Sequence, residues 1–425
     1  MKVDVVIVGA GPAGLCLARS LSGQGLSIGL IERQSCTELA DPPLDGREIA
    51  LTHASQHILE TLGLWQRVHG DEIAVLRDAQ VLNGPSPYAL RIAAAAAGKQ
   101  RLGCLVPNQA IRRAAYAAVQ ECADIELLAE CTINELSCSA EGVALRLSDG
   151  RRLQARLIVA ADSRFSETRR RLGIGARMED FGKTMLVCRM AHERSHEQIA
   201  WEWFGYGQTL ALLPLNGNLA SAVLTLAPGH MNQVMSLDQQ AFAREMERRF
   251  DGRLGRMELV GERTTYPLIG VYAERFSGVR SALVGDAAVG MHPVTAHGFN
   301  LGLQSQKRLT DSLLDALHNG RDIGAPAVLQ RYARAQQRAS WPLYQATSLL
   351  VRLYTDDRTP TRLLRNAGLR LAQNLPPFKA ALARHLTQVS RSGLSEKSPS
   401  AGTFRTEPNQ LSAARCIFTR CRHSM

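Results

Sequence analysis

The feature that most constrains this chain is a glycine-rich turn between a strand-like and a helix-like segment near its start. Residues 3–8 read VDVVIV, an apolar run typical of a buried strand, and residues 9–14 read GAGPAG. The following LCLARSLSGQG has helical periodicity, with Pro12 where a helix would begin and Gly25 where it would end. SIGLIE then predicts a second strand. Together these segments predict a β-α-β unit.

The spacing of the glycines indicates what this turn binds. Gly9, Gly11 and Gly14 form the GxGxxG pattern of dinucleotide-binding folds in its proper strand-turn-helix context. Glycines let backbone N–H groups approach a pyrophosphate at the positive end of the helix. Glu32 closes the second strand, where a carboxylate accepts hydrogen bonds from ribose hydroxyls. We expect FAD or NAD rather than NADP, the alternative being a fortuitous glycine turn.

A second constrained segment, GDAAVGMHPVTAHGFNLG, occupies residues 285–302. The preceding SALVG predicts a buried strand, which places Asp286 at the carboxyl edge of a sheet, where open α/β sheets bind ligands. Gly298 precedes FNLGLQSQKRLTDSLLDAL, a predicted helix whose first N–H groups would face the same crevice. We expect this site to hold the other end of an extended cofactor. The alternative is a strand-turn-helix connection with glycines for packing.

The remaining pattern predicts an α/β fold with an inserted sheet. Residues 107–122 predict a helix, 125–148 a strand pair and 153–161 one buried strand; between about 180 and 270, alternating segments with a turn at Asn216-Gly217 predict an antiparallel sheet. The expected division is a discontinuous dinucleotide-binding domain at 1–180 and 271–325, a substrate-binding sheet domain at 181–270, C-terminal helices at 326–389 and a disordered tail at 390–425.

Composition narrows the function classes. No apolar run approaches the roughly 20 residues that span a bilayer, so a cytoplasmic location is expected. The nine cysteines show no CxxC pair or Cys/His ligand spacing, so no metal is expected. The net charge of +11 belongs to the C-terminal end, since residues 331–425 alone sum to +12. Neither interleaved aromatics nor a recognition motif accompanies that charge, which disfavours nucleic acid and favours a membrane surface or an acidic partner.

Three motifs, in order, resemble those of the class A flavin monooxygenases related to para-hydroxybenzoate hydroxylase, and among them the ring hydroxylases of ubiquinone biosynthesis. The first is the GxGxxG turn with Glu32. The second, ADSRFSETR at 161–169, resembles the family's D-G-x-x-S-x-x-R motif, tied to both FAD and NAD(P)H. The third, at 285–300, resembles the flavin motif G-D-A-A-H-x-x-x-P-x-x-G-q-G-x-N. The likeness spans roughly residues 1–385 and implies a Rossmann-like FAD-binding domain.

The resemblance also implies site residues. DGREIALTHAS resembles the subgroup's D-x-R-x-x-A-L segment, which places Arg47 near the flavin and the substrate. Asn108 in VPNQAI matches a helix-start position that contacts FAD, and Pro293 is expected beside the flavin ring. Pro293 and Arg47 are the expected catalytic residues, in positional roles. The expected FAD-binding residues are Gly9, Gly11, Pro12, Ala13, Gly14, Glu32, Arg33, Arg47, Asn108, Asp162, Arg169, Gly285, Asp286, Pro293, Gly298, Phe299 and Asn300.

The chain departs from the family pattern at several positions. Ser163 replaces a usual glycine, Val289 stands where His is common, Ala296 and His297 replace Gly-Gln, and Ser305 replaces an acidic residue. Backbone amides can still serve the flavin, so we expect FAD binding to survive and substrate positioning to differ.

The implied activity is ring hydroxylation in ubiquinone biosynthesis. NAD(P)H would reduce FAD, O2 would give a C4a-hydroperoxide, and an electron-rich polyprenyl phenol or quinol would take the terminal oxygen. The protein would supply a pocket that excludes water and orients the substrate ring. The resemblance is compatible with hydroxylation at ring position 1, 5 or 6. The altered 289–305 region favours C5 hydroxylation of a 5-demethoxyubiquinol-type precursor or relaxed regioselectivity.

Several rival functions remain open. A secondary-metabolite or salicylate-type phenol hydroxylase is one. A flavin-dependent halogenase is another, since Trp201-Glu202-Trp203 gives the W-x-W of that family's W-x-W-x-I-P motif, although Phe204 follows it. A non-catalytic flavoprotein subunit of a quinone-biosynthesis complex belongs to a different class.

The C-terminal region predicts a basic amphipathic helix, a type that binds membrane surfaces. Its apolar stripe is interrupted by Pro376-Pro377 and comprises Leu364, Ala367, Leu371, Leu375, Phe378 and Leu382, with Arg362, Arg365 and Arg370 nearby. Because a polyprenyl substrate lives in the bilayer, we expect peripheral association with the inner face of the membrane or with a ubiquinone-biosynthesis complex. The alternative is a helix packed on its own domain with a solvated basic face.

Overall fold

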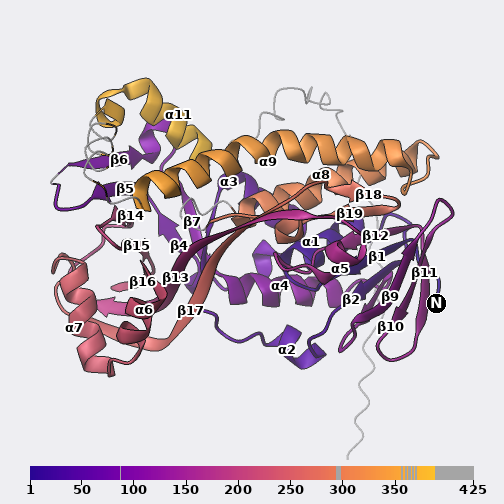
Figure 1. Cartoon of the computed structure of the whole chain (residues 1–425), viewed down its shortest axis with the longest axis horizontal. Helices are drawn as coiled ribbons and strands as arrows, with labels where there is room; N and C mark the ends of the chain where they lie inside the picture. Colours follow the sequence, from indigo (N-terminus) through magenta and orange to yellow (C-terminus); the bar gives the residue numbers. More distant parts are fainter. Residues whose placement is uncertain are drawn as a thin grey trace, which may run out of the picture. The chain divides into compact units, whose positions relative to one another are not determined.

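A computed structural model describes residues 1–86, 88–292, 298–355 and 371–387, together with Arg358, Thr361, Arg365 and Gly368 (Figure 1). By its internal contacts the chain divides into Met1–Val389 and Ser390–Met425, and all the described residues belong to the first unit. The expected flavin neighbour Pro293, the substituted positions Ala296 and His297, and the predicted disordered tail lie outside the described residues.

A six-stranded sheet forms the nucleotide-binding fold. The GAGPAG turn joins its central strand β1 to helix α1, and β1 pairs in parallel with β2 on one side and β12 on the other. The order is β18 (Ser277–Gly278), β19 (Ser281–Leu283), β12 (Leu157–Ala160), β1 (Val5–Val8), β2 (Ile28–Ile31) and β8 (Ile125–Leu128). The strands from both sequence motifs, β1 and β19, therefore flank β12 and end at the same edge.

Both faces of this sheet are covered, which explains why its strands are continuously apolar. Val5 and Ile7 point into a core with α1 (Pro12–Leu21), α4 (Asn108–Gln120) and α8 (Gly298–His318). Val6 and Val8 point to the other side, onto a three-stranded sheet of β9 (Ile133–Cys138), β10 (Val143–Leu147) and β11 (Arg152–Ala155). All four residues of β1 are buried.

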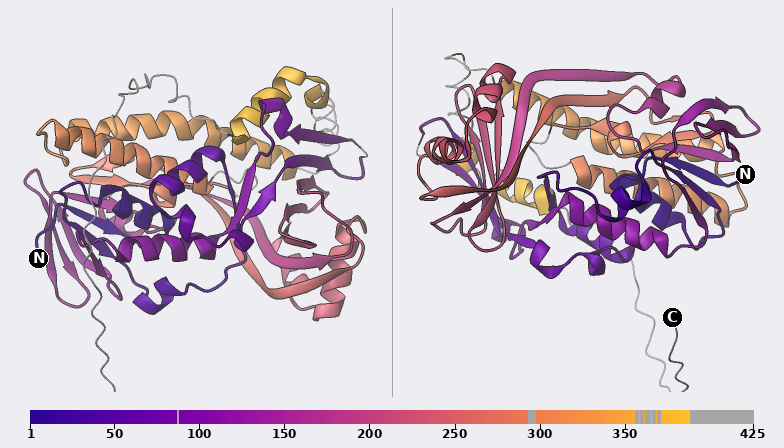
Figure 2. Two further views of the ribbon diagram at one scale, coloured as in Figure 1. Left: turned by 180° about the vertical axis from the view of Figure 1, so that it is seen from behind. Right: turned by 90° about the horizontal axis from the view of Figure 1, so that it is seen from below.

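A second, eight-stranded sheet lies beside the nucleotide fold (Figures 1 and 2). Its neighbouring pairs are antiparallel except β14 and β5, which are parallel. The strands, in order, are β20 (Val289–Gly290), β17 (Met257–Ala273), β13 (Ala176–His192), β16 (Leu219–Leu226), β15 (Thr209–Pro214), β14 (Ile199–Phe204), β5 (Asp78–Asn83) and β6 (Ala89–Ala93). The 17-residue β13 and β17 pair along most of their length and connect this sheet to the nucleotide fold.

Alternation along these strands gives the sheet two different faces. One face packs on α6 (Pro228–Met235) and α7 (Gln239–Arg249) through an apolar cluster that includes Leu210, Leu224 and Phe242. The other face lines the cavity described below. A small sheet of β3 (Glu48–Leu51), β7 (Gly103–Pro107) and β4 (Ala74–Leu76) closes the cavity from another side.

Helices complete the described fold. The long α9 (Pro326–Thr355) packs against α8, and α11 (Pro376–Thr387) packs against β6 (Figure 2). Three shorter helices are α2 (Cys36–Ala40), α3 (His53–Thr61) and α5 (Glu167–Arg171).

The structure corrects several sequence-based boundaries. Helix α1 ends at Leu21 rather than at Gly25, because Ser22 leaves the helical conformation at φ −64° and ψ 143°. Residues 125–148 hold three strands instead of a pair, with β8 in the central sheet. The single strand predicted at 153–161 is two, β11 and β12, because the chain passes from one sheet to the other between them. The expected interruption at Pro376-Pro377 is present, since helical residues 371–374 end before Leu375 and α11 begins at Pro376, a favoured position for proline.

The antiparallel sheet predicted between about 180 and 270 is present, but it is larger than expected. Strands β5 and β6, far earlier in the chain, extend one edge and β20 extends the other. Nothing in the local alternation of residues 78–93 could show which sheet they join.

Tyr332 explains the substitution at Ser305. Its buried hydroxyl lies 2.7 Å from the Ser305 hydroxyl and donates to the carbonyl of Leu283 at 2.6 Å, which ties α9 and α8 to the end of β19. Serine at this position therefore shares a hydrogen bond with the phenol, and Arg308 is a charged group beside it.

We expect Tyr332→Phe to lower the free energy of unfolding by about 1–3 kcal/mol, because the Ser305 hydroxyl and the Leu283 carbonyl lose a buried partner. Urea unfolding would measure it, with Ser305→Ala and the double variant completing a cycle. Additive losses in that cycle would contradict the shared hydrogen bond.

Candidate active site

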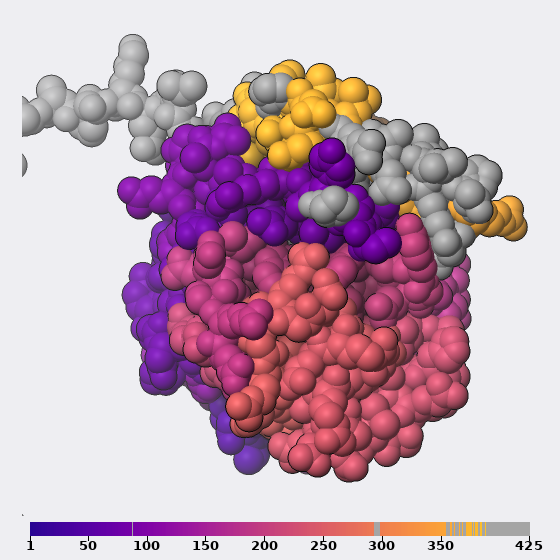
Figure 3. Space-filling view, turned by 90° about the vertical axis from the view of Figure 1, so that its left-hand side faces the viewer, coloured from indigo at the N-terminus to yellow at the C-terminus, as the bar shows by residue number. Residues whose placement is uncertain are grey.

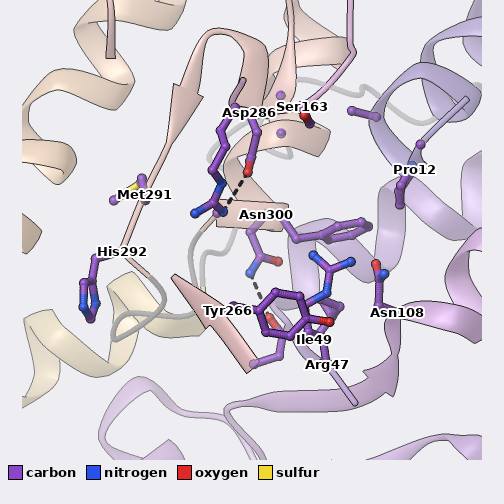
Figure 4. A pocket seen from close by; sticks show the side chains of 18 of the residues that line it. Pro12, Arg47, Ile49, Asn108, Ser163, Tyr266, Asp286, Met291, His292 and Asn300 are labelled. Atoms are coloured by element: carbon purple, nitrogen blue, oxygen red, sulfur yellow. Dashed lines mark hydrogen bonds and ion pairs between the residues drawn. The ribbon is translucent and has the colours of Figure 1, made fainter. Parts of the chain in front are cut away.

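One large cavity runs from the nucleotide fold to the eight-stranded sheet. Its volume is about 1450 Å³, above the roughly 300–1,000 Å³ of ordinary ligand pockets. One end is lined by the GAGPAG turn, and the other by the cavity face of the sheet. Figure 4 shows residues from both sequence motifs around this space, including Pro12 and Asp286. The cavity is therefore large enough for an elongated cofactor and a second molecule together.

The glycine turn forms a cradle, a backbone surface with space that side chains would otherwise fill. A Cβ added to Gly14 would lie 1.9 Å from the carbonyl oxygen of Gly9, and Gly9 itself has φ +103°. Gly11, which lines the cavity, has open space where its side chain would be. Pro12 is the first residue of α1, so the positive end of that helix meets the same space. These features fit a bound pyrophosphate.

The second glycine segment comes into direct contact with the first. A Cβ added to Gly285, at φ +60°, would lie 2.9 Å from the Cβ of Ala13. Gly298 and Phe299, at the start of α8, line the cavity nearby. The two segments, far apart in the sequence, thus form one continuous wall, as a single extended cofactor requires.

Glu32 lies at the end of β2, as its spacing predicts. It is buried, and its carboxylate accepts the backbone N–H groups of Ala10 at 2.6 Å and Gln34 at 2.9 Å. Arg33 lines the same end but is exposed. The sequence analysis missed Arg112, which lines the cavity and donates to the Gln34 side chain at 2.9 Å; its place one turn after Asn108 on α4 is the signal that could have found it.

Arg47 and Asn108 are brought together by a carboxylate that the sequence analysis did not single out. Asp45 accepts hydrogen bonds from the Arg47 Nε at 3.0 Å and from the Asn108 side chain at 2.7 Å. The Arg47 guanidinium lies 5.6 Å from the centre of the Tyr266 ring, and the Tyr266 hydroxyl donates to the Asp45 carbonyl at 2.8 Å. Figure 4 shows Arg47, Tyr266 and Asn108 around the cavity. The arrangement fixes a cation where the two ends of the cavity meet.

The motif at 161–169 both lines the cavity, through residues that include Asp162 and Thr168, and builds a short helix. Asp162 accepts the Ser166 hydroxyl and, at 3.0 Å, the backbone N–H of Thr168, while Ser166 caps α5. Ser163, at the position of the usual glycine, has φ +77° and lines the cavity. Arg169 is buried and donates to the carbonyl of Ala287 at 3.0 Å. Since Arg169 does not line the cavity, its contacts are those of a residue that positions the 285–288 turn.

Asp286 lines the cavity and pairs with an arginine that the sequence analysis did not assign. Its carboxylate lies 3.0 Å from Arg164, whose other donor reaches the carbonyl of Ile269 at 3.0 Å (Figure 4). Asn300 is buried and links α8 to β3, because it donates to the Ala50 carbonyl at 2.8 Å and accepts the Thr52 N–H at 3.1 Å. Both residues line the cavity.

Two further cavity residues have shifted pKa values. Burial, aided by the Arg164 guanidinium, lowers the pKa of His292 to about 4, so its imidazole is neutral at neutral pH. Burial raises the pKa of Glu48, although Arg189 donates to it at 2.7 and 3.0 Å. Neither residue was assigned from sequence, since a lone His or Glu carries no spacing signal.

Comparison with known proteins agrees with this geometry. A family model described as "FAD binding domain" matches residues 2–347. The chain is 46% identical to a protein of Neisseria meningitidis named ubiquinone hydroxylase UbiM, over 90% of this chain and 84% of that protein. It is 37% identical to ubiquinone hydroxylase UbiL of Rhodospirillum rubrum, over 90% and 89% respectively.

Solved structures share the fold. The p-nitrophenol 4-monooxygenase PnpA from Pseudomonas putida superposes with a TM-score of 0.74 at 16% identity, covering 91% of this chain and 98% of that one. PqsL from Pseudomonas aeruginosa, a probable FAD-dependent monooxygenase, gives 0.68 at 22%, covering 87% and 100%.

We expect Glu32→Ala to weaken FAD binding by about 10- to 100-fold, because a hydrogen bond to a charged group is worth about 1.5–3 kcal/mol. Quenching of flavin fluorescence during titration of the apoprotein would measure the dissociation constant. The exposed Glu38→Gln is the matched control on α2. Equal affinity for both variants would remove Glu32 from the site.

Proposed function

The chain belongs to the FAD-binding domain family, and on that premise we propose that it is an FAD-dependent monooxygenase that hydroxylates the ring of a polyprenylated phenol or quinol in ubiquinone biosynthesis. The observation that carries the proposal is the 46% identity to a ubiquinone hydroxylase over 84% of that relative. It agrees with a cavity that has room beyond a nucleotide site.

The residues present fit FAD, which when bound would supply electron transfer and the activation of O2. The glycine cradle and the α1 N-terminus would hold the pyrophosphate, and Glu32 would bind a ribose. Asp286 and the start of α8 would hold the flavin half. We propose positional roles for Arg47 and Pro293, with Arg47 held by Asp45 toward the junction of the two sites.

The lining at the sheet end of the cavity supports the proposal of an apolar, ring-shaped substrate with a tail. Val187, Ala211 and Val223 form part of its wall, and the wall continues to Leu90 and Ile92 on the outer strand. Beyond them the lining comes from C-terminal residues Leu350, Gly368 and Ala372. Figure 3 shows α11, in yellow, beside the violet segment that contains β5 and β6 at this end of the molecule. An apolar arm of this kind would exclude water from the ring and accommodate isoprene units.

We further propose NAD(P)H as the reductant and position 5 of the ring as the site of oxygen insertion, or a relaxed choice among positions. Both follow from the resemblance of the motif at 161–169 and from the substitutions between 289 and 305.

The proposed function predicts that a demethoxyubiquinol analogue with a short isoprenoid tail stimulates NAD(P)H consumption and yields a ring-hydroxylated product, identifiable by mass spectrometry. A tail-free analogue should show a higher KM, because the apolar arm stays empty. NAD(P)H consumption that is indifferent to every phenol and quinol would contradict the proposal and favour a non-catalytic flavoprotein.

Peripheral membrane binding is proposed to deliver the tail. Large apolar side chains are exposed in the C-terminal region, with Leu349 at 70% and Leu371 at 63% of full exposure, in a segment whose net charge is +12. Arg365, expected on the basic face, is instead buried, so it does not contribute to that surface. Residues Leu364, Ala367, Arg362 and Arg370 lie outside the described ones. None of the helices among the described residues is long and apolar enough to cross a bilayer.

Anionic liposomes should co-sediment with the full chain at low salt, and deletion of residues 361–425 should abolish this, because the deletion removes most of the C-terminal charge. Neutral liposomes serve as the control. Unchanged binding after the deletion would refute this mode of membrane association.

A further inference from the structure

A carboxyl group stands on the cavity face of the eight-stranded sheet. Glu202 lies in β14, directly opposite Ala211 on β15 and Val81 on β5. The same row continues to Val223 and Val187. All five residues line the cavity, whereas alternate residues such as Leu210 and Leu224 pack toward the helices on the other face. The strand register therefore directs Glu202 into the cavity.

This carboxyl has an environment unlike that of the other acids in the cavity. Among the described residues that line the cavity from β5, β6 and β13 to β16, Glu202 alone carries an ionisable group. No hydrogen bond or ion pair links its carboxyl to another described residue. Glu48 and Asp286, by contrast, each accept from an arginine, and Glu32 accepts two backbone N–H groups.

An unpaired carboxyl in an apolar cavity costs stability, so its place there calls for a ligand that donates a hydrogen bond. In the proposed function, on which this inference rests, the substrate ring carries a hydroxyl group. We propose that Glu202 accepts the hydrogen bond and then the proton of that hydroxyl, and so activates the ring for oxygen transfer.

The proposed proton transfer balances within the site. The O–H bond of the substrate breaks, its electron pair stays on the ring oxygen, and the proton forms a new bond to a carboxylate oxygen of Glu202. The phenolate is more electron-rich than the phenol and attacks an electrophilic oxygen more readily. After oxygen insertion, which FAD, O2 and the reductant supply, Glu202 returns the proton to the product oxygen.

The surroundings of Glu202 suit it to this task. Burial raises its pKa from 4.5 to about 8. An ordinary phenol has a pKa of about 10, so a carboxylate at about 8 is a far better matched base than one at 4.5. On the neighbouring strands β5 and β6, Asp78 pairs with Arg91, and elsewhere in the cavity wall Glu48 pairs with Arg189. Neither pair contributes to the shift, whose cause is burial.

The test is the pH dependence of hydroxylation by the FAD-loaded enzyme, with the short-tail demethoxyubiquinol analogue as the probe. In the native protein, the rate of product formation should rise with pH and level off above about 8, because the carboxylate is the active form. Glu202→Gln should form product on the order of 100-fold more slowly and lose this rise. It should keep its FAD content and its reductant consumption, since it removes a base and leaves the nucleotide end intact.

Controls separate this inference from the proposed function. Glu262→Gln, an exposed change on β17, should match the native enzyme throughout. A second readout, which needs no turnover, is the affinity for 2-methoxyphenol at pH 8.5, measured by isothermal titration calorimetry. Glu202→Gln should bind it about 10-fold more weakly, because the charged hydrogen-bond acceptor is lost, and both proteins should bind methoxybenzene, which lacks the hydroxyl, equally. If the native enzyme hydroxylates the probe while Glu202→Gln keeps its rate, its pH profile and its affinity for 2-methoxyphenol, the role of Glu202 is refuted and the proposed function stands. If the native enzyme forms no product, the proposed function fails.

Discussion

The close approach of two glycine segments is the contact on which the rest of the structure depends. Gly14 leaves no room for a side chain beside the Gly9 carbonyl, and Gly285 meets Ala13 in the same way. These contacts bring the ends of β1 and β19 and the starts of α1 and α8 to one edge of the central sheet. Backbone donors and helix dipoles then face a common space, which is what an extended dinucleotide needs.

The second sheet extends the nucleotide site into a larger cavity, with space for a substrate beside the cofactor. Strands β13 and β17 continue from the nucleotide fold into the sheet, so one cavity has a polar end and an apolar end. Arg47 lies between them, held by Asp45. Such a division lets the polar end bind the cofactor while the apolar end keeps water from the reacting ring.

Sequence reasoning was strongest where local backbone chemistry decides the structure. The GxGxxG turn, the helix starts at Pro12 and Gly298, and the position of Glu32 at the end of β2 follow from short-range spacing. It was weakest where distant segments meet. The Asp45 contact with Asn108, the Arg164–Asp286 pair and the addition of β5 to the second sheet depend on tertiary packing that no local pattern encodes.

The central claim is that both glycine segments hold a single FAD molecule, and the absorption spectrum of the purified protein tests it most directly. The account predicts a yellow protein whose released flavin is FAD, with one molecule per chain. A colourless protein that stays colourless after incubation with FAD and gel filtration would contradict it.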